Sequence, residues 1–187
     1  MKKNKLLIIL TLLTILMVNA ACRLPSRKPD STPVPISTEA AEQFEENLES
    51  AAESFQTSES ITVTLTQEEI TSYIVSNLPP DLEFEVTDLQ IFLNNDQIEV
   101  YGNVDQGMIS ADAKIVIKPN IDAYGQIRTE IIEFNVGPFP ISQSMKDNLS
   151  AQIDDAIMNA LQANDNDIIV KSIDINNGQM IITASKG

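Results

Sequence analysis

The chain has 187 residues, 12 Lys and Arg against 27 Asp and Glu, no His, one Cys and a formal charge of −15. Without His it can build neither an imidazole zinc site nor Ser-His-Asp or Cys-His catalysis, and one Cys cannot form a disulfide within the chain. The acidic balance argues against nucleic acid as a partner, because Lys and Arg supply the affinity for phosphate backbones. What remains is one modest domain.

Residues 1–21 are typical of a bacterial lipoprotein signal peptide. Three lysines precede an apolar run over 6–18, which is too short to cross a hydrocarbon core of about 30 Å as a helix. Small residues and Cys22 follow, so we expect Cys22 to be lipidated and to hold the mature protein at the extracytoplasmic face of the cell membrane. Asn19 stands where such signals usually carry Leu, which leaves open an ordinary secretory signal or an uncleaved N-terminal anchor.

Residues 22–38 are predicted to be a tether, because four prolines lie among Ser and Thr with no apolar period. Residues 39–57 have a helical period, with apolar side chains on one narrow stripe and six glutamates elsewhere. We expect this acidic amphipathic helix to pack on the domain or to form a partly ordered stalk. A lid over an apolar groove is the alternative.

Residues 60–187 are predicted to fold as an α+β domain. Period-two patterns and helical stripes follow one another in the order strand, helix, four strands, helix, two strands. Thr66 and Glu69 form a capping box before the first helix, and Asn177-Gly178 marks a type I′ hairpin between the last two strands. The six or seven strands are therefore expected to form an antiparallel sheet whose dry face meets the two amphipathic helices.

Two of the four central strands, at 83–93 and 126–136, change apolar phase by one residue along their length. Such a slip indicates a bulge, or a strand that changes the side it buries, and both bend a sheet.

Four features resemble a known group of proteins: the stretch 65–70, the stretch 117–127, the break at 136–141 before the long helix, and the closing hairpin. Together they are similar to the YpmS-like and LmeA-like membrane-anchored bacterial proteins, whose fold is related to tubular lipid-binding domains. The resemblance covers 60–187 and implies a strongly curved antiparallel sheet wrapped around a long helix. It also implies an apolar channel or groove for acyl chains, with no catalytic residues.

Under this resemblance, aliphatic positions of the first helix, of the third central strand and of the long helix would bind the lipid. These are Ile70, Ile74, Ile109, Ile115, Ile117, Leu149, Ile153 and Ile157. The same positions could instead fill an ordinary closed core.

The expected function is non-catalytic binding or shuttling of acyl-chain lipids at the membrane, without cofactor or metal. The carboxylate pairs Asp154/Asp155 and Glu130/Glu133 offer no acid–base site, since the first pair diverges on a helix and the second lies on opposite sides of a strand. A structural or regulatory lipoprotein that docks on a membrane protein complex, through its acidic surface or its first helix, is the second reading.

Overall fold

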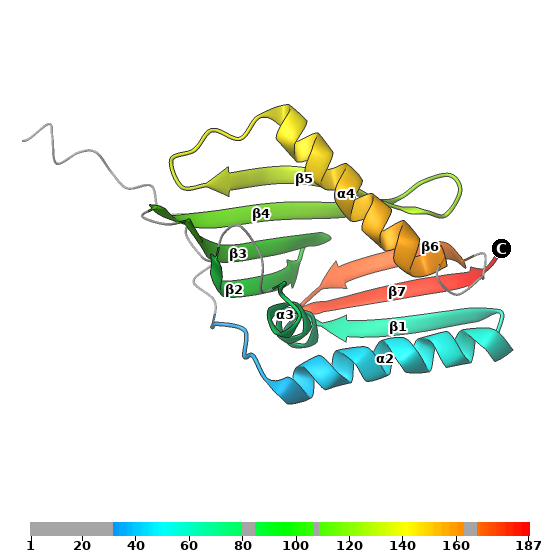
Figure 1. The fold of residues 1–187 in the computed structure, drawn as a ribbon. Helices are drawn as coiled ribbons and strands as arrows, with labels where there is room; N and C mark the ends of the chain where they lie inside the picture. Colours follow the sequence, from blue (N-terminus) through cyan, green and yellow to red (C-terminus); the bar gives the residue numbers. More distant parts are fainter. Residues whose placement is uncertain (1–31, 80–84, 107–108, 163–167) are drawn as a thin grey trace, which may run out of the picture.

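The computed structural model describes residues 32–79, 85–106, 109–162 and 168–187 (Figure 1). This part of the chain is α+β with antiparallel sheets and three helices, which confirms the predicted class. The signal peptide and Cys22 lie outside it. In chain order, the elements are α2 (Thr38–Thr57), β1 (Ser60–Thr66), α3 (Gln67–Ser76), β2 (Glu85–Asn94), β3 (Gln97–Gln106), β4 (Ile109–Ile121), β5 (Ile127–Val136), α4 (Gln143–Gln162), β6 (Ile168–Asn176) and β7 (Gln179–Lys186).

The described strands form two sheets, where the sequence suggested one. The first has the order β1-β7-β6 and the second the order β2-β3-β4-β5, all antiparallel. The division arises because helix α3 carries the chain out of the first sheet after β1, and helix α4 brings it back after β5 (Figure 1).

The two sheets are joined by backbone hydrogen bonds at both ends of the domain. At one end the two hairpin turns meet: Asp96 N donates to Ile175 O at 3.0 Å, and Gly178 N donates to Leu93 O at 2.9 Å. At the other end, Val170 N of β6 donates to the carbonyl of Gly125 in the β4–β5 loop at 2.9 Å. Ile91 and Leu93 of β2 and Ile175 of β6 form a buried cluster that spans the two sheets.

The local signals in the sequence form the predicted caps and turns. Glu69 N donates to Thr66 Oγ1 at 3.2 Å and Thr66 N donates to Glu69 Oε2 at 2.6 Å, which is the reciprocal capping box of α3. Asn177 and Gly178 have φ values of 51° and 78°, as a type I′ turn requires.

Both predicted phase slips are bulges. The β2–β3 ladder shifts register between Thr87 and Gln90, and the β4–β5 ladder shifts at Val116/Ile117. In the second case Ile132 has no partner in the ladder and is 43% exposed. The extra residue returns the apolar side chains of β5 to the inner face, as bulges do.

The segment before α2 packs on the outer face of the four-stranded sheet. Val34 is 3% exposed and clusters with Phe92 and Tyr101. Its backbone N–H donates to Gln90 Oε1 at 2.6 Å. Residues near the end of the expected tether therefore belong to the folded domain, which includes Val34. Helix α2 follows directly, and its N-cap is Ser37, whose Oγ accepts a hydrogen bond from Ala40 N at 3.1 Å.

Candidate ligand-binding groove

An apolar groove of about 330 Å³ lies between helix α2 and one face of the β1-β7-β6 sheet. Its volume is at the lower end of the range for small-molecule sites, roughly 300–1,000 Å³. The lining residues come from α2, β1, β6, β7 and the first residue of β5. They are Leu48, Ala51, Ala52, Phe55, Gln56, Ile61, Val63, Leu65, Ile127, Ile168, Val170, Ile182 and Ala184.

Two aromatic side chains of helix α2 are packed, one beyond the groove and one in its lining. Phe44 stacks on Tyr73 of α3 with ring centroids 4.4 Å apart, and Phe55 is 2% exposed. Between Phe44 and Phe55 the stripe that faces the sheet carries the small residues Ala51 and Ala52. The short alanine side chains leave space between this part of the helix and the sheet.

The floor of the groove follows from strand periodicity. Ile61, Val63 and Leu65 of β1 share one face, and the register sets Ile61 beside Ala184 and Val63 beside Ile182. These side chains are branched aliphatics or alanine, and Gln56 is the one lining residue with a polar side chain. Such a lining can exclude water and hold a hydrocarbon, but it offers no group for proton transfer or metal binding.

None of the eight residues expected to bind lipid is among those lining this groove. On α3, Ile70 packs against the Ile91, Leu93 and Ile175 cluster, whereas Ile74 is 37% exposed.

The other predicted residues belong to β4 and α4. Ile115 and Ile117 are half-buried and pair with Val100 and Ile98 of β3 on the inner face of the sheet. Ile109 begins β4, but its side chain lies outside the described part of the structure.

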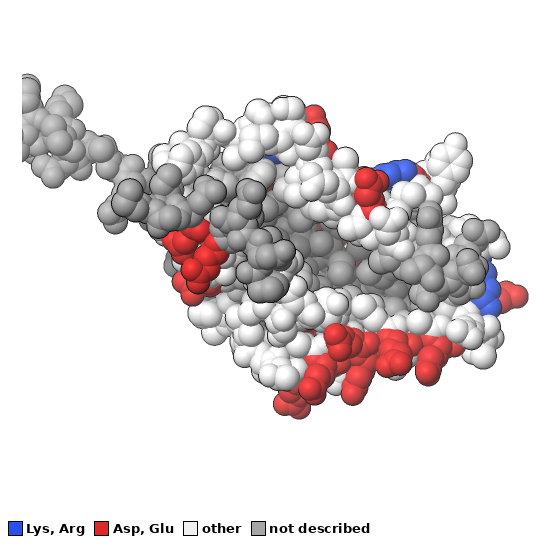
Figure 2. Space-filling view, in the orientation of Figure 1, with Lys and Arg blue, Asp and Glu red and all other residues white. Residues whose placement is uncertain are grey.

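On α4, Leu149, Ile153 and Ile157 are each half-buried. The surface of the molecule is hollowed between α4 and α2 (Figure 2). Aliphatic side chains of α4 and of the inner sheet face are thus partly accessible.

Part of the groove has a signal in the sequence. The apolar stripe of α2 and the period-two pattern of β1 are both visible there, and a lid over an apolar groove is one of the alternatives for the helix. The sequence does not reveal that β1 pairs with β7, which lies more than a hundred residues further along the chain. That pairing provides Ile182 and Ala184.

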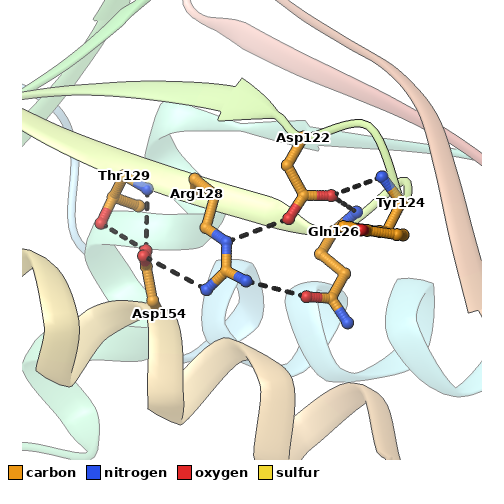
Figure 3. Close-up of polar contacts among 6 residues, drawn as sticks. All are labelled: Asp122, Tyr124, Gln126, Arg128, Thr129 and Asp154. Carbon is orange, nitrogen blue, oxygen red and sulfur yellow. Dashed lines mark hydrogen bonds and ion pairs between the residues drawn. The ribbon is translucent and has the colours of Figure 1, made fainter.

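A second site, made of polar residues, lies where α4 meets the edge strand β5 (Figure 3). Asp154 Oδ1 of α4 accepts hydrogen bonds from Thr129 N at 2.7 Å and Thr129 Oγ1 at 2.8 Å. Its other oxygen lies 3.9 Å from Arg128, whose Nε also donates to Asp122 at 3.1 Å. These carboxylates are occupied by partners within the chain, so the cluster positions the helix and the β4–β5 loop and does not resemble a catalytic pair.

The loop at this cluster is organised around Asp122. Its Oδ1 accepts from Gln126 N at 3.0 Å and from Tyr124 N at 2.9 Å. These backbone donors, that of Gln126 first, and Arg128 lower the pKa of Asp122 below its ordinary value, since they stabilise the charged form.

Within the described residues, no group of three or more Cys, Asp or Glu is arranged to hold a metal ion. No described helix is both long enough and apolar enough to span a membrane. In comparisons with known proteins, no family model and no curated sequence matches this chain.

Proposed function

We propose that this protein is a lipid-anchored extracytoplasmic protein that binds or shuttles acyl-chain lipids at the cell membrane, without catalysis. The observation that carries the proposal is the groove beneath α2, whose lining is apolar apart from Gln56. A hydrocarbon chain is the ligand that such a surface suits, because each methylene removed from water contributes about 0.8 kcal/mol.

The energetics favour passive exchange. A lipid in a bilayer is already in an apolar environment, so its transfer into an apolar groove has a free energy near zero. Binding of this kind lowers the barrier to lipid movement, or holds a lipid for another protein, without consuming energy. The predicted anchor at Cys22 would keep the domain beside the membrane from which the lipid comes.

In this proposal the groove is one part of a longer apolar channel. The two sheets would curve around α4, as in tubular lipid-binding domains, and the predicted residues of α3, β4 and α4 would face its interior. The partial accessibility of Ile115, Ile117 and the aliphatic residues of α4 supports this arrangement, as does the hollow between α4 and α2 (Figure 2).

The test is to fill the groove. Ala52 lines it and is exposed, so Ala52→Phe should occupy the space without crowding the buried core. Gln43→Phe is the matched control, because it places the same side chain on an exposed position of α2 away from the lining. We expect native mass spectrometry to show co-purified lipid on the unaltered chain and on Q43F, and at least fivefold less on A52F. Absence of lipid from all three proteins would contradict the proposal.

A second candidate is supported by the acidic surface of α2. Its exposed glutamates form a row along the helix (Figure 2). They are Glu39, Glu42, Glu45, Glu46, Glu49 and Glu53. In this reading the row docks on a basic surface of a membrane protein complex. Crosslinking in cells that recovers one stoichiometric partner, lost when these glutamates become glutamines, would favour it, together with a lipid-free domain.

A further inference from the structure

One end of the groove carries a lysine. Strand β7 contributes Ile182 and Ala184 to the lining, and since side chains alternate along a strand, Lys186 lies on the same face two residues further. Its partner across the ladder is Ile168 of β6, which also lines the groove. The apolar row of β7 therefore ends in a cation.

The side chain of Lys186 turns towards the helix that covers the groove. Its Nζ donates to the carbonyl of Gln56 at 3.1 Å and lies 5.8 Å from the ring centroid of Phe55. Both residues belong to the lining. Nearby, the backbone N–H of Lys186 donates to the carbonyl of Glu59 at 3.0 Å. The ammonium group is thus held where the last turn of α2 meets the end of the groove.

Lys186 is exposed at the end of β7, and its amine differs in its partners from two other described cations. Lys114 lies 2.6 Å from Glu133, and Arg128 is paired with Asp122 and Asp154. Among the described residues, no ion pair includes Lys186. Its remaining hydrogen-bond donors are available to a negative group.

We infer that the groove binds a single-chain amphiphile whose anionic group, a carboxylate or a phosphate, is held by Lys186 while the chain lies along the apolar lining. The inference rests on the proposed function and adds the chemical class of the ligand and its orientation in the groove. The volume of about 330 Å³ is near the lower end of the range for small-molecule sites, roughly 300–1,000 Å³. A groove of this size suits a single chain better than two.

The orientation follows from the same residues. Lys186, Phe55 and Gln56 are at one end, and Leu48 of α2 with Leu65 of β1 lie towards the other. The molecule is strongly acidic, with a formal charge of −15, so an anionic group is repelled by most of the surface and is attracted at this end. The chain of the ligand should therefore extend towards Leu48 and Leu65.

The experiment uses photoreactive ligands with the full chain in phosphatidylcholine nanodiscs. Three twelve-carbon compounds carry a diazirine at the end of the chain: dodecanoic acid, dodecanol and dodecyl lysophosphatidic acid. Labelled peptides are located after cleavage at glutamate, because the chain has no Lys or Arg between Lys28 and Lys114. We expect labels within residues 46–53 and 60–68. The half-saturating ligand concentration should be about tenfold lower for the two acids than for the alcohol.

Lys186→Ala should raise the half-saturating concentration of dodecanoic acid about tenfold and leave that of dodecanol unchanged, whereas Lys186→Arg should keep the preference for the acid. Lys171→Ala is the control, because Lys171 is exposed on the neighbouring strand and is not part of the lining. A lower half-saturating concentration for the phosphate compound would identify a phospholipid-derived ligand. A lower one for dodecanoic acid would identify a free fatty acid.

Two negative results are distinguishable. If none of the three compounds labels the groove, the proposed function is overturned and the inference with it. If acid and alcohol label equally and K186A changes neither, the inference alone is overturned, and the groove remains a site for uncharged hydrocarbon.

Discussion

Single side chains decide how the separate elements of this domain are held together. Strand β5 is at the edge of its sheet, so some of its backbone N–H groups have no hydrogen-bond acceptor on a neighbouring strand. One of them, Thr129 N, donates to Asp154 of α4. The carboxylate of Asp154 also accepts from the hydroxyl of Thr129, and its side chain is 14% exposed. One residue therefore joins the long helix to the sheet.

We expect Asp154→Ala to lower the free energy of unfolding by about 1.5–3 kcal/mol, the usual contribution of a hydrogen bond to a charged group. Asp155→Ala is the matched control, because Asp155 is exposed and makes no described hydrogen bond, so its effect should stay within about 0.5 kcal/mol. Urea denaturation followed by circular dichroism measures both. Equal effects of the two substitutions would show that the contact with Thr129 does not hold the helix.

Asp122 predicts a pH dependence of stability. Hydrogen bonds from the backbone of Gln126 and Tyr124, and from Arg128, lower the pKa of Asp122 in the folded state below its ordinary value of 3.8. The stabilisation it provides is therefore complete above that value and is lost as the pH falls through the lowered, folded-state pKa. The difference in unfolding free energy between the unaltered chain and Asp122→Asn should shrink as the pH is lowered from about 5 to about 2. A constant difference would contradict this assignment.

At the scale of elements, the β4–β5 loop packs closely against strand β6. Gly125 has φ 74° and its carbonyl receives Val170 N, so the loop is attached to β6 of the other sheet. A Cβ on Gly125 would strike the side chain of Ile169, whereas a Cβ on Gly178 would lie 3.2 Å from atoms of the long side chain of Gln67.

Gly125→Ala should therefore cost about 2–3 kcal/mol, from the left-handed backbone and the collision together. Gly178→Ala, with a similar φ of 78° but a flexible neighbour, should cost about 1 kcal/mol. Thermal unfolding at neutral pH measures the difference. The same cost for both would mean that Ile169 moves aside and that the loop is not tightly fitted against β6.

On the scale of the whole molecule, the acidic and apolar surfaces are separated. Helix α2 presents a row of glutamates to solvent (Figure 2), whereas Ala51 and Ala52 line the groove. The row of acids should keep the domain from lying flat on an anionic membrane, while residues 1–31, which precede the described part, include the predicted anchor. A groove held beside a membrane in this way needs access to lipid but no energy source.

Cys22→Ser tests the anchor. If lipidation of Cys22 retains the protein, the variant should move from the membrane pellet to the soluble fraction and lose incorporation of labelled palmitate. The unaltered chain, fractionated in parallel, should stay in the pellet. A variant that remains with the membrane would point instead to an uncleaved N-terminal segment.

Several features could be predicted from the sequence because they depend on neighbours within a few residues. The capping box at Thr66 and Glu69, the turn at Asn177-Gly178 and the bulges in β2 and β5 are set by local backbone preference and by which side chains must leave water. The α+β class follows from the same periodicities.

The groove could not be predicted in the same way, because its walls come from α2, β1, β6, β7 and the start of β5. Periodicity shows that Ile61 and Ala184 each face one side of a strand, but only the tertiary structure makes them neighbours. The sequence by itself determined which faces are apolar. The folded chain decided which of those faces meet, and that the face of α2 with Ala51 and Ala52 leaves room above the sheet.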